Sequence, residues 1–242
     1  MTGFRLAGGG GPVIPNFGQP SACLKNNGWF CTDWMSKHWG DTLQPALVQH
    51  IQLTLIAVGI GFAIAFVLAL IGFRWRIFDA PLGGFTDFLY AISSLALFQL
   101  LVPLTGLTVT TVEVALTSYT LFILYRNIIA GLRAVPEEVL ESARGMGLTR
   151  LQTFFRVELP LAAPAILAGV RIATVATISI ATVAAFLIQY GLGAPIFDAI
   201  ETPDLFKTEL IAAGGLTILL ALTADGLLAV AQRTLTPWNR TR

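Results

Sequence analysis

The chain has 242 residues, of which 55% are hydrophobic and only 12% are charged, and its mean hydropathy is +0.74. Soluble domains carry about 25% charged residues, so this composition excludes an ordinary soluble protein and indicates a polytopic membrane protein. The formal net charge of +1, with no basic patch interleaved with aromatic residues, argues against a nucleic-acid partner.

Residues 1–43 contain no apolar run long enough to cross a membrane, and we expect them to form an extracytoplasmic tail. Glycine and proline between positions 8 and 20 disfavour a helix there. No apolar run follows the first methionine, so no cleavable signal peptide is predicted. Aromatic side chains are typical of the membrane–water interface, so an interfacial belt or a short surface helix is expected just before the first span. The aromatic residues there are Trp29, Phe30, Trp34 and Trp39.

Both cysteines of the chain, Cys23 and Cys31, fall in this tail. An extracytoplasmic location permits a disulfide between them. Two unpaired thiols are the alternative. A zinc site with His38 is disfavoured, because structural zinc requires four ligands, and no metal site is predicted.

Five apolar stretches follow, each reaching or nearly reaching the roughly 20 residues that a bilayer core requires. Their approximate bounds are 46–71, 85–102, 107–129, 162–189 and 210–231. The sequence therefore predicts an all-α, polytopic membrane helical bundle of about five transmembrane helices. The bundle forms one domain, residues 44–232.

The distribution of arginine predicts the orientation of the bundle. With alternating topology, the segments 73–81, 130–160 and 233–242 share one side and hold nine arginines. The loops around 103–107 and 190–208 hold one lysine and three acidic residues. Because an excess of Lys and Arg marks the cytoplasm, we expect a cytoplasmic tail at 233–242 and an N-terminus outside.

Several polar residues lie inside the predicted spans. Glu113, about six residues into the third span, is interpreted as a pore-lining or gating group or as a satisfied structural contact. Thr174 and Thr177 favour close helix packing, and lining of a translocation pathway is the alternative. Asp87 and Arg171 lie near span ends, where snorkelling or an ion pair is expected.

The most highly charged segment of the chain lies between the third and fourth spans, and its local signals predict two short helices. Pro136 suits the first position of the first helix, and Gly147 suits a left-handed residue that ends it. Thr149 and Gln152 form a capping box at the start of the second helix. Pro160 is expected to close that helix.

The same segment carries a spaced pattern. It reads Glu141-Ser142-Ala143, three residues, Gly147, nine residues, and then Val-Glu-Leu-Pro at 157–160. This resembles the EAA loop of ABC importer permeases, in which E-A-A, G and I-x-L-P occur at the same spacings. An ordinary cytoplasmic helical hairpin is the alternative interpretation.

Further stretches resemble the osmoprotectant subfamily, whose permeases carry glycine betaine, choline, carnitine and related quaternary amines. They are 50–55, 125–127, 131–136, 156–160 and 169–174. Gly191-Leu-Gly193 resembles the end of a longer glycine run in that subfamily, and the chain departs from this run at Gln189 and Tyr190.

The resemblance implies the type I importer fold, in a bacterial or archaeal cell membrane. It implies two permeases, as two copies or two paralogues, on a dimer of cytoplasmic ATPases, with an extracytoplasmic solute-binding protein. ATP and Mg²⁺ would then bind the ATPase. The chain has no GxxxxGK[ST] motif, and we predict neither a bound cofactor nor catalytic residues.

A coupling loop at 134–160 is therefore expected to contact the ATPase, with apolar side chains as its anchors. The anchors are Val139, Leu140, Met146, Leu151 and Phe155. The coupling residues that the resemblance implies are Glu141, Ser142, Ala143, Gly147, Leu151, Leu159 and Pro160.

Three other functions remain as alternatives. They are a permease for polar amino acids or another small solute, an ATP-independent secondary transporter or channel, and a membrane enzyme. Secondary transporters usually show inverted repeats or interrupted helices, and the sequence has no convincing repeat. An enzyme is disfavoured because the only two histidines, His38 and His50, lie near the outer surface.

Overall fold

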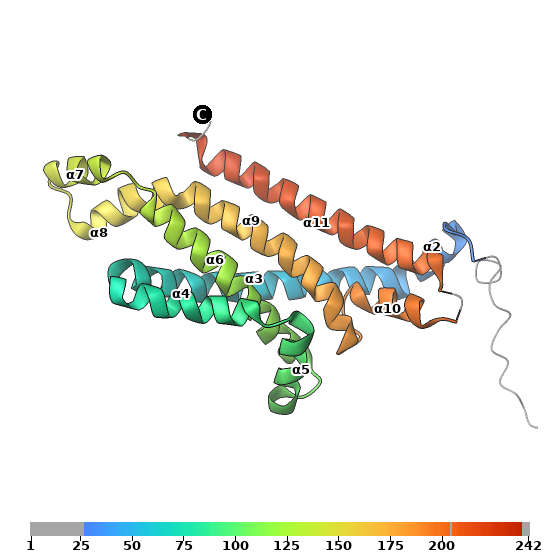
Figure 1. Cartoon of the computed structure of the whole chain (residues 1–242). Coiled ribbons are helices and arrows are strands. Elements are labelled where there is room, and N and C mark those ends of the chain that lie inside the picture. Colours follow the sequence, from blue (N-terminus) through green and yellow to red (C-terminus); the bar gives the residue numbers. More distant parts are fainter. Residues whose placement is uncertain (1–26, 204, 239–242) are drawn as a thin grey trace, which may run out of the picture.

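The computed structural model describes residues 27–203 and 205–238, and every regular element in these two ranges is helical (Figure 1). In chain order the elements are α2 (Thr32–His38), η1 (Trp39–Leu43), α3 (Gln44–Arg74), α4 (Arg76–Ala91), α5 (Ser94–Thr105), α6 (Val109–Arg133), α7 (Glu137–Gly145), α8 (Arg150–Thr153), η2 (Phe154–Glu158), α9 (Leu159–Val183), η3 (Ala184–Phe186), α10 (Gly193–Glu201) and α11 (Lys207–Leu235). The predicted all-α fold is confirmed.

Four helical stretches are long and apolar enough to cross a membrane, and a fifth crossing results if the bent pair α4–α5 counts as one. The four are Thr32–Arg74, Val109–Arg133, Arg150–Phe186 and Lys207–Leu235. The prediction of about five spans agrees with this architecture. The first helical run begins in α2, earlier than the predicted start at residue 46, because η1 joins α2 to α3 without a break.

The second span, expected over 85–102, is bent and starts earlier than expected. Helix α4 begins at Arg76, inside the expected loop, and α4 and α5 meet at an angle of 98°. At the bend, Ile92 and Ser93 have extended backbone, with ψ of 132° and 138°. The freed carbonyl of Ile92 accepts a hydrogen bond from the hydroxyl of Tyr119 in α6. This contact gives the Ile92 carbonyl, which lies at the break in the helix, a hydrogen-bond partner. The apolar composition of the span does not predict it.

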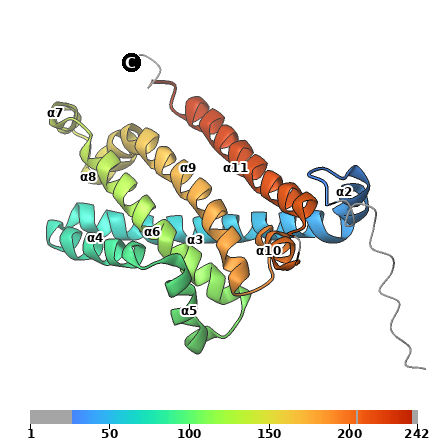
Figure 2. The same cartoon turned by 45° about the vertical axis from the view of Figure 1, so that its right-hand side comes forward.

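Helix α6 forms the centre of the bundle, between α3 and α9 (Figure 2). Its side chains Leu124, Tyr125 and Ile128 are at most 1% exposed. A Cβ at Gly61 of α3 would lie 1.8 Å from the hydroxyl oxygen of Thr120, so glycine there allows α3 and α6 to approach closely. The position of α6 therefore depends on tight packing against both neighbours.

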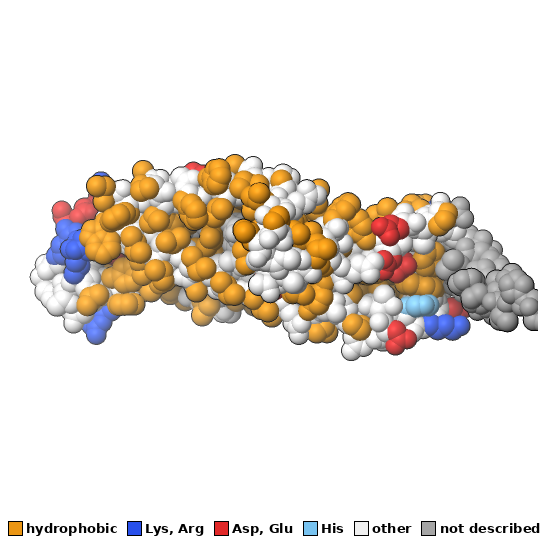
Figure 3. Space-filling model, turned by 90° about the horizontal axis from the view of Figure 1, so that it is seen from below, with side chains coloured by type: hydrophobic (Ala, Val, Ile, Leu, Met, Phe, Trp, Pro, Cys, Tyr) orange, Lys and Arg blue, Asp and Glu red, His pale blue; other side chains and the backbone are white. Residues whose placement is uncertain are grey.

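The surface is divided along the long axis of the molecule. Hydrophobic side chains cover the central part of the face in Figure 3, and charged side chains gather toward the two ends. The α3–α4 turn, helices α7 and α8, and the end of α11 all lie toward the same end (Figures 1 and 2). This arrangement fits a multi-pass membrane protein, as the composition predicts.

At the opposite end, the start of the described chain packs on the beginning of α11. The Asn27 side-chain amide donates to the carbonyl of Leu205 at 3.1 Å, and its oxygen accepts from the Lys207 backbone N–H at 3.1 Å. Trp34 of α2 is buried against Phe206, with ring centroids 5.2 Å apart. The short helix expected near the aromatic residues is therefore present as α2.

Only one of the two cysteines of the predicted disulfide lies among the described residues. Cys31 caps the start of α2 and packs at the edge of the Trp34 cluster. It does not carry a free thiol. Cys23 lies outside the described residues, so its pairing with Cys31 stays a prediction. His38 is stacked on Trp34, and its Nδ1 lies 2.9 Å from the Trp34 carbonyl oxygen.

Candidate functional site

The charged segment between α6 and α9 forms the two predicted short helices, α7 and α8, at one end of the molecule (Figure 1). Gly147 has φ of +79°, as the left-handed cap requires. Its N–H donates to the carbonyl of Arg144 at 2.9 Å, and the Leu148 N–H donates to the carbonyl of Ala143 at 3.2 Å. Pro136 lies one residue before α7 rather than inside it.

The second helix starts as predicted and ends differently. The Gln152 side chain accepts from the Thr149 N–H at 2.9 Å, and Thr149 Oγ1 accepts from the Gln152 N–H at 3.4 Å, which completes the capping box. The prediction that Pro160 closes this helix is wrong, because one helical run continues from Arg150 to Phe186. A π-helical turn, η2, joins α8 to α9, and Pro160 lies in the first turn of α9, directly after η2.

The coupling segment, residues 134–160, presents exposed apolar side chains. Met146, Leu151 and Phe155 are 73%, 72% and 62% exposed, and Val139 is 38% exposed. Leu140, the fifth predicted anchor, is half-buried. The exposed apolar tip, defined here as Val139, Met146, Leu151 and Phe155, has the composition of a contact surface.

The other coupling residues take different positions. Glu141 and Ser142 are exposed, and the Ser142 hydroxyl donates to the carbonyl of Glu138 at 2.8 Å. Ala143 is 1% exposed and packs inside the segment. Leu159 and Pro160 are half-buried at the start of α9. Their roles in ATPase contact stay predictions.

Close packing between α6 and α9 supports the base of the coupling segment. A Cβ at Gly131 would lie 2.9 Å from Ala165 Cβ and 3.0 Å from the Ala162 carbonyl oxygen. A Cβ at Gly169 would lie 2.5 Å from Asn127 Cβ. The two helices that enter and leave the coupling segment are thus in direct backbone-level contact.

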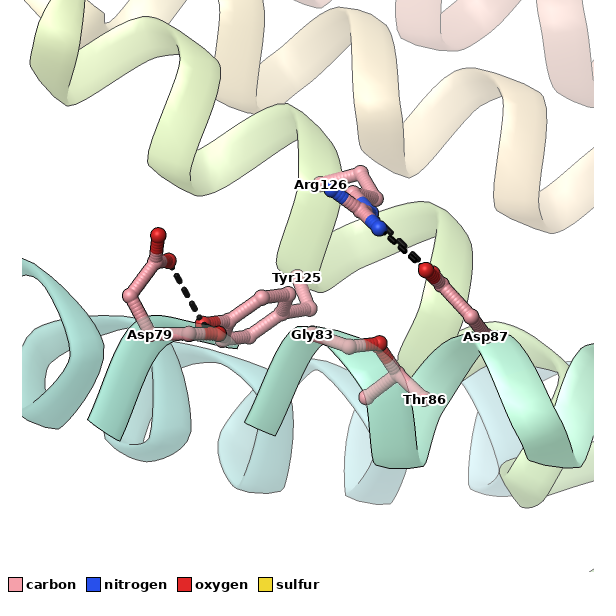
Figure 4. Close-up of polar contacts among 6 residues, drawn as sticks. All are labelled: Asp79, Gly83, Thr86, Asp87, Tyr125 and Arg126. Atoms are coloured by element: carbon pink, nitrogen blue, oxygen red, sulfur yellow. Dashed lines mark hydrogen bonds and ion pairs between the residues drawn. The ribbon is translucent and has the colours of Figure 1, made fainter. Parts of the chain in front are cut away.

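Polar contacts tie α4 to α6 on the side of the coupling segment (Figure 4). Asp79 accepts from the Tyr125 hydroxyl at 3.0 Å and forms an ion pair with Arg133 at 2.8 Å. Further along both helices, Arg126 Nε donates to Asp87 Oδ1 at 3.1 Å, and a second guanidinium nitrogen contacts Oδ2. An ion pair was one of the two interpretations of Asp87 in the sequence, and the structure contains it.

Small residues make room for Tyr125 between three helices. A Cβ at Gly72 would lie 2.6 Å from the Tyr125 hydroxyl oxygen, and one at Gly83 would lie 3.7 Å from its ring. Arg133, which pairs with Asp79, is the last residue of α6 and precedes α7 by only three residues. The sequence analysis did not identify the contacts among Asp79, Tyr125 and Arg133. The acidic residues 79 and 87 are eight positions apart in α4, and the arginines 126 and 133 are seven apart in α6. This matching spacing could have indicated two ion pairs between the helices.

A second ion pair joins α9 to α11. Arg171 donates to both carboxylate oxygens of Asp225, at 2.9 and 2.8 Å. Gln232 accepts from Arg171 at 3.3 Å and donates to the Pro164 carbonyl at 2.9 Å. The interpretation of Arg171 as a member of an ion pair agrees with this geometry.

The three candidate pathway residues lie on two helices, Glu113 on α6 and Thr174 and Thr177 on α9. The hydroxyls of Thr174 and Thr177 donate to Val170 and Ala173 of their own helix at 2.8 and 2.7 Å, and both side chains are buried. Their burial favours the interpretation as close helix packing. Glu113 in α6 is half-buried, and its Oε2 atom is buried with no hydrogen-bond partner in the described part of the chain. The pathway role of all three stays a prediction.

The family described as "Binding-protein-dependent transport system inner membrane component" matches residues 57–236, which include the whole coupling segment. The chain belongs to this family. It is therefore a membrane-spanning permease component, and the resemblance carried by the EAA pattern is confirmed.

Two curated relatives are similar to this permease over most of their length. The choline transport system permease protein OpuBB of Bacillus subtilis (strain 168) is 37% identical over 190 residues, which are 78% of this chain and 86% of the relative. The osmoprotectant import permease protein OsmW of Salmonella typhimurium is 34% identical over 195 residues, 78% of this chain and 89% of the relative. Both similarities extend over most of each protein.

Solved structures support the fold of the permease. The inward-facing MetNI methionine ABC transporter matches with a TM-score of 0.72 and 17% sequence identity, over 85% of this chain and 100% of that chain. An amino acid ABC transporter with histidines matches with a TM-score of 0.68 and 20% identity, over 83% of this chain and 97% of that chain. At such low identity these likenesses concern the fold alone, and they confirm the predicted importer-permease fold.

Proposed function

We propose that this permease imports osmoprotectants with a quaternary ammonium group, of the glycine betaine, choline and carnitine class, into the cell. The observation that carries the proposal is the similarity at 37% and 34% identity to the choline and osmoprotectant permeases, over 78% of the chain in each case. The family match over residues 57–236 includes the coupling segment, which supports a role in transport.

The proposed transporter contains two permeases, as two copies of this chain or one copy and a paralogue, on a dimer of cytoplasmic ATPases. ATP and Mg²⁺ bind to the ATPases, so this chain itself catalyses no reaction. The exposed apolar tip at Met146, Leu151 and Phe155 supports this arrangement, because such a surface is stabilised when a partner covers it. An extracytoplasmic binding protein delivers the solute.

The proposed orientation places the N-terminus outside a bacterial or archaeal cell membrane and the C-terminus in the cytoplasm, with lipid around the apolar belt. ATP-driven closure of the ATPases moves the coupling segment. Because α6 and α9 touch at Gly131 and Gly169, the movement tilts both helices as a rigid body. The ion pairs of Asp79 and Asp87 make α4 follow α6.

The test is uptake of labelled glycine betaine by cells that express the permease with its ATPase and binding protein. Choline, carnitine, proline and histidine compete as unlabelled solutes. We expect saturable uptake that the quaternary amines block and that an ATPase knockout removes. Uptake that survives the knockout would indicate a secondary transporter. No betaine uptake, with histidine or another amino acid carried instead, would support an amino-acid permease.

Glu113 is the proposed contact for the positive charge of the solute along the path. We expect Glu113→Gln to raise the KM for choline, a cation, about tenfold, which corresponds to about 1.4 kcal/mol. The KM for glycine betaine, which carries no net charge, should change much less, because the lost attraction is partly offset by lost repulsion of its carboxylate. Uptake kinetics with both solutes measure the difference.

Glu209→Gln is the matched control, since it removes the same charge from the first turn of α11. If Glu113→Gln and Glu209→Gln change the two KM values equally, or if Glu113→Gln affects both solutes alike, Glu113 does not contact the solute charge.

A further inference from the structure

His50, in the second turn of α3, is fully buried, and its two ring nitrogens contact backbone groups of two other elements. Nε2 lies 3.1 Å from the carbonyl oxygen of Ile178 in α9. Nδ1 accepts a hydrogen bond of 3.2 Å from the N–H of Leu192, in the turn between α9 and α10. One side chain thus joins α3, the outer part of α9 and the start of α10, which lie side by side in Figure 1.

These two partners determine which nitrogen carries the proton. The Leu192 N–H is a donor, so Nδ1 must present its lone pair. A carbonyl oxygen only accepts, so Nε2 must carry the hydrogen that points toward Ile178. His50 is therefore a neutral imidazole with a defined donor and a defined acceptor, and both are used.

The same turn is held at a second point and has no room for larger residues. The Gly191 N–H donates to Gln49 Oε1 at 3.0 Å. Gly191 has φ of +73°, and a Cβ there would lie 3.1 Å from His50 Nδ1. A Cβ at Gly193 would lie 2.2 Å from the carbonyl oxygen of Thr182 in α9. The turn 189–193 is therefore seated directly on α3 and α9.

The contacts of His50 lie at a position on α9 where a movement of that helix affects them. The helical run that contains α9 starts at Arg150 in the coupling segment and reaches Phe186, so its two ends lie on opposite sides of the membrane. Ile178, which His50 contacts, lies near the outer end of this run. A tilt of α9 driven from the coupling segment must therefore either carry the turn 189–193 with it or break the His50 contacts.

We propose that His50 is a positioning residue for transport, which makes the turn 189–193 follow α9 and α3 when the coupling segment moves. The hydrogen bond from Leu192 to Nδ1 is the essential contact, and the bond to Ile178 aligns the ring. Gln49 acts with it through Gly191. This inference rests on the proposed importer function and names the residue that carries movement to the outer loop.

Two amide variants separate the two contacts of His50. In His50→Asn, the side-chain oxygen occupies the position of Nδ1, so the acceptor for Leu192 is kept and the donor to Ile178 is lost. In His50→Gln, the amide nitrogen reaches the position of Nε2, so the donor is kept and the acceptor is lost. His50→Leu removes both, and Gly191→Ala displaces the turn from His50 without substituting His50 itself.

The experiment uses proteoliposomes with the complete transporter, and it measures glycine betaine uptake and ATP hydrolysis for each variant. We expect His50→Leu, His50→Gln and Gly191→Ala to lose at least about tenfold in uptake per ATP hydrolysed, while ATP hydrolysis changes by less than about twofold. His50→Asn should retain at least half of the wild-type ratio. Thr54→Val is the control, because the buried Thr54 hydroxyl donates only within α3, to the His50 carbonyl at 2.9 Å.

Hydrogen exchange of residues 189–193 in the purified permease provides a readout that does not depend on transport. Exchange should accelerate at least tenfold in His50→Gln and His50→Leu, and much less in His50→Asn. Equal uptake per ATP in His50→Gln and wild type, or equal losses in the Asn and Gln variants, would overturn the proposal. A wild-type transporter that carries no betaine would instead overturn the proposed function, and the exchange result would still stand.

Discussion

Leu151→Asp is expected to abolish ATP-driven uptake by removing the contact between the permease and its ATPase. Leu151 is 72% exposed at the tip of the coupling segment, where Met146 and Phe155 are also exposed. Covering a leucine side chain contributes about 1.5–3 kcal/mol, and a carboxylate placed in the same apolar contact adds a desolvation cost. We therefore expect about a 100-fold or greater loss of ATPase affinity, since about 1.4 kcal/mol corresponds to a factor of ten. Co-purification of the ATPase with the tagged permease and solute uptake measure the two effects.

Leu151→Met is the matched control, because it keeps an apolar side chain of similar volume at the same position. The Met variant should retain ATPase and uptake within about twofold, and both variants should reach the membrane in equal amounts, since Leu151 lies outside the packed bundle. Normal uptake by Leu151→Asp would show that the apolar tip is not the ATPase contact.

Gly131→Leu is expected to cause a large loss of stability in the bundle. At this position a Cβ alone would meet Ala165 Cβ at 2.9 Å and the Ala162 carbonyl oxygen at 3.0 Å. The larger side chain must push α6 and α9 apart, and overpacking of this kind costs about 1–3 kcal/mol or more. Because these helices enter and leave the coupling segment, uptake should fall at least tenfold. Thermal unfolding of the purified permease and uptake measure both consequences.

Gly59→Leu controls for the substitution itself. Gly59 is also a helix glycine, in α3, and no neighbouring helix in the described part of the chain comes within 4 Å of a Cβ at this position. It should leave the unfolding temperature and uptake close to those of the unaltered permease. If Gly131→Leu proved as stable and as active as Gly59→Leu, the contact between α6 and α9 would not support the coupling segment.

Local chemistry made the coupling segment the most predictable part of the molecule. A left-handed glycine at 147 and the capping box of Thr149 and Gln152 each involve residues within a few positions of one another. Such interactions form in the same way in almost any fold, so a single sequence carries enough information to predict them. The EAA spacing adds the family, because its residues lie within one short segment.

The predictions of where helices bend or end were less accurate. The sequence predicted one span over 85–102, but the structure bends at Ile92 and Ser93. Pro160 was expected to end a helix and lies inside the first turn of α9. In both places a neighbouring element or turn, Tyr119 in the first and η2 in the second, satisfies the backbone in a way that composition does not record.

The sequence by itself determined the class of the protein, its membrane-spanning helical architecture, the coupling segment and the family. It did so because apolar run length, capping residues and motif spacing are local properties. Only the tertiary structure decided which polar residues meet: Asp79 with Arg133, Arg171 with Asp225, and His50 with Ile178 and Leu192. These partners are 54, 54, 128 and 142 residues apart in the chain. Which of them come together depends on the crossing of whole helices, which close packing at a few glycines and alanines determines.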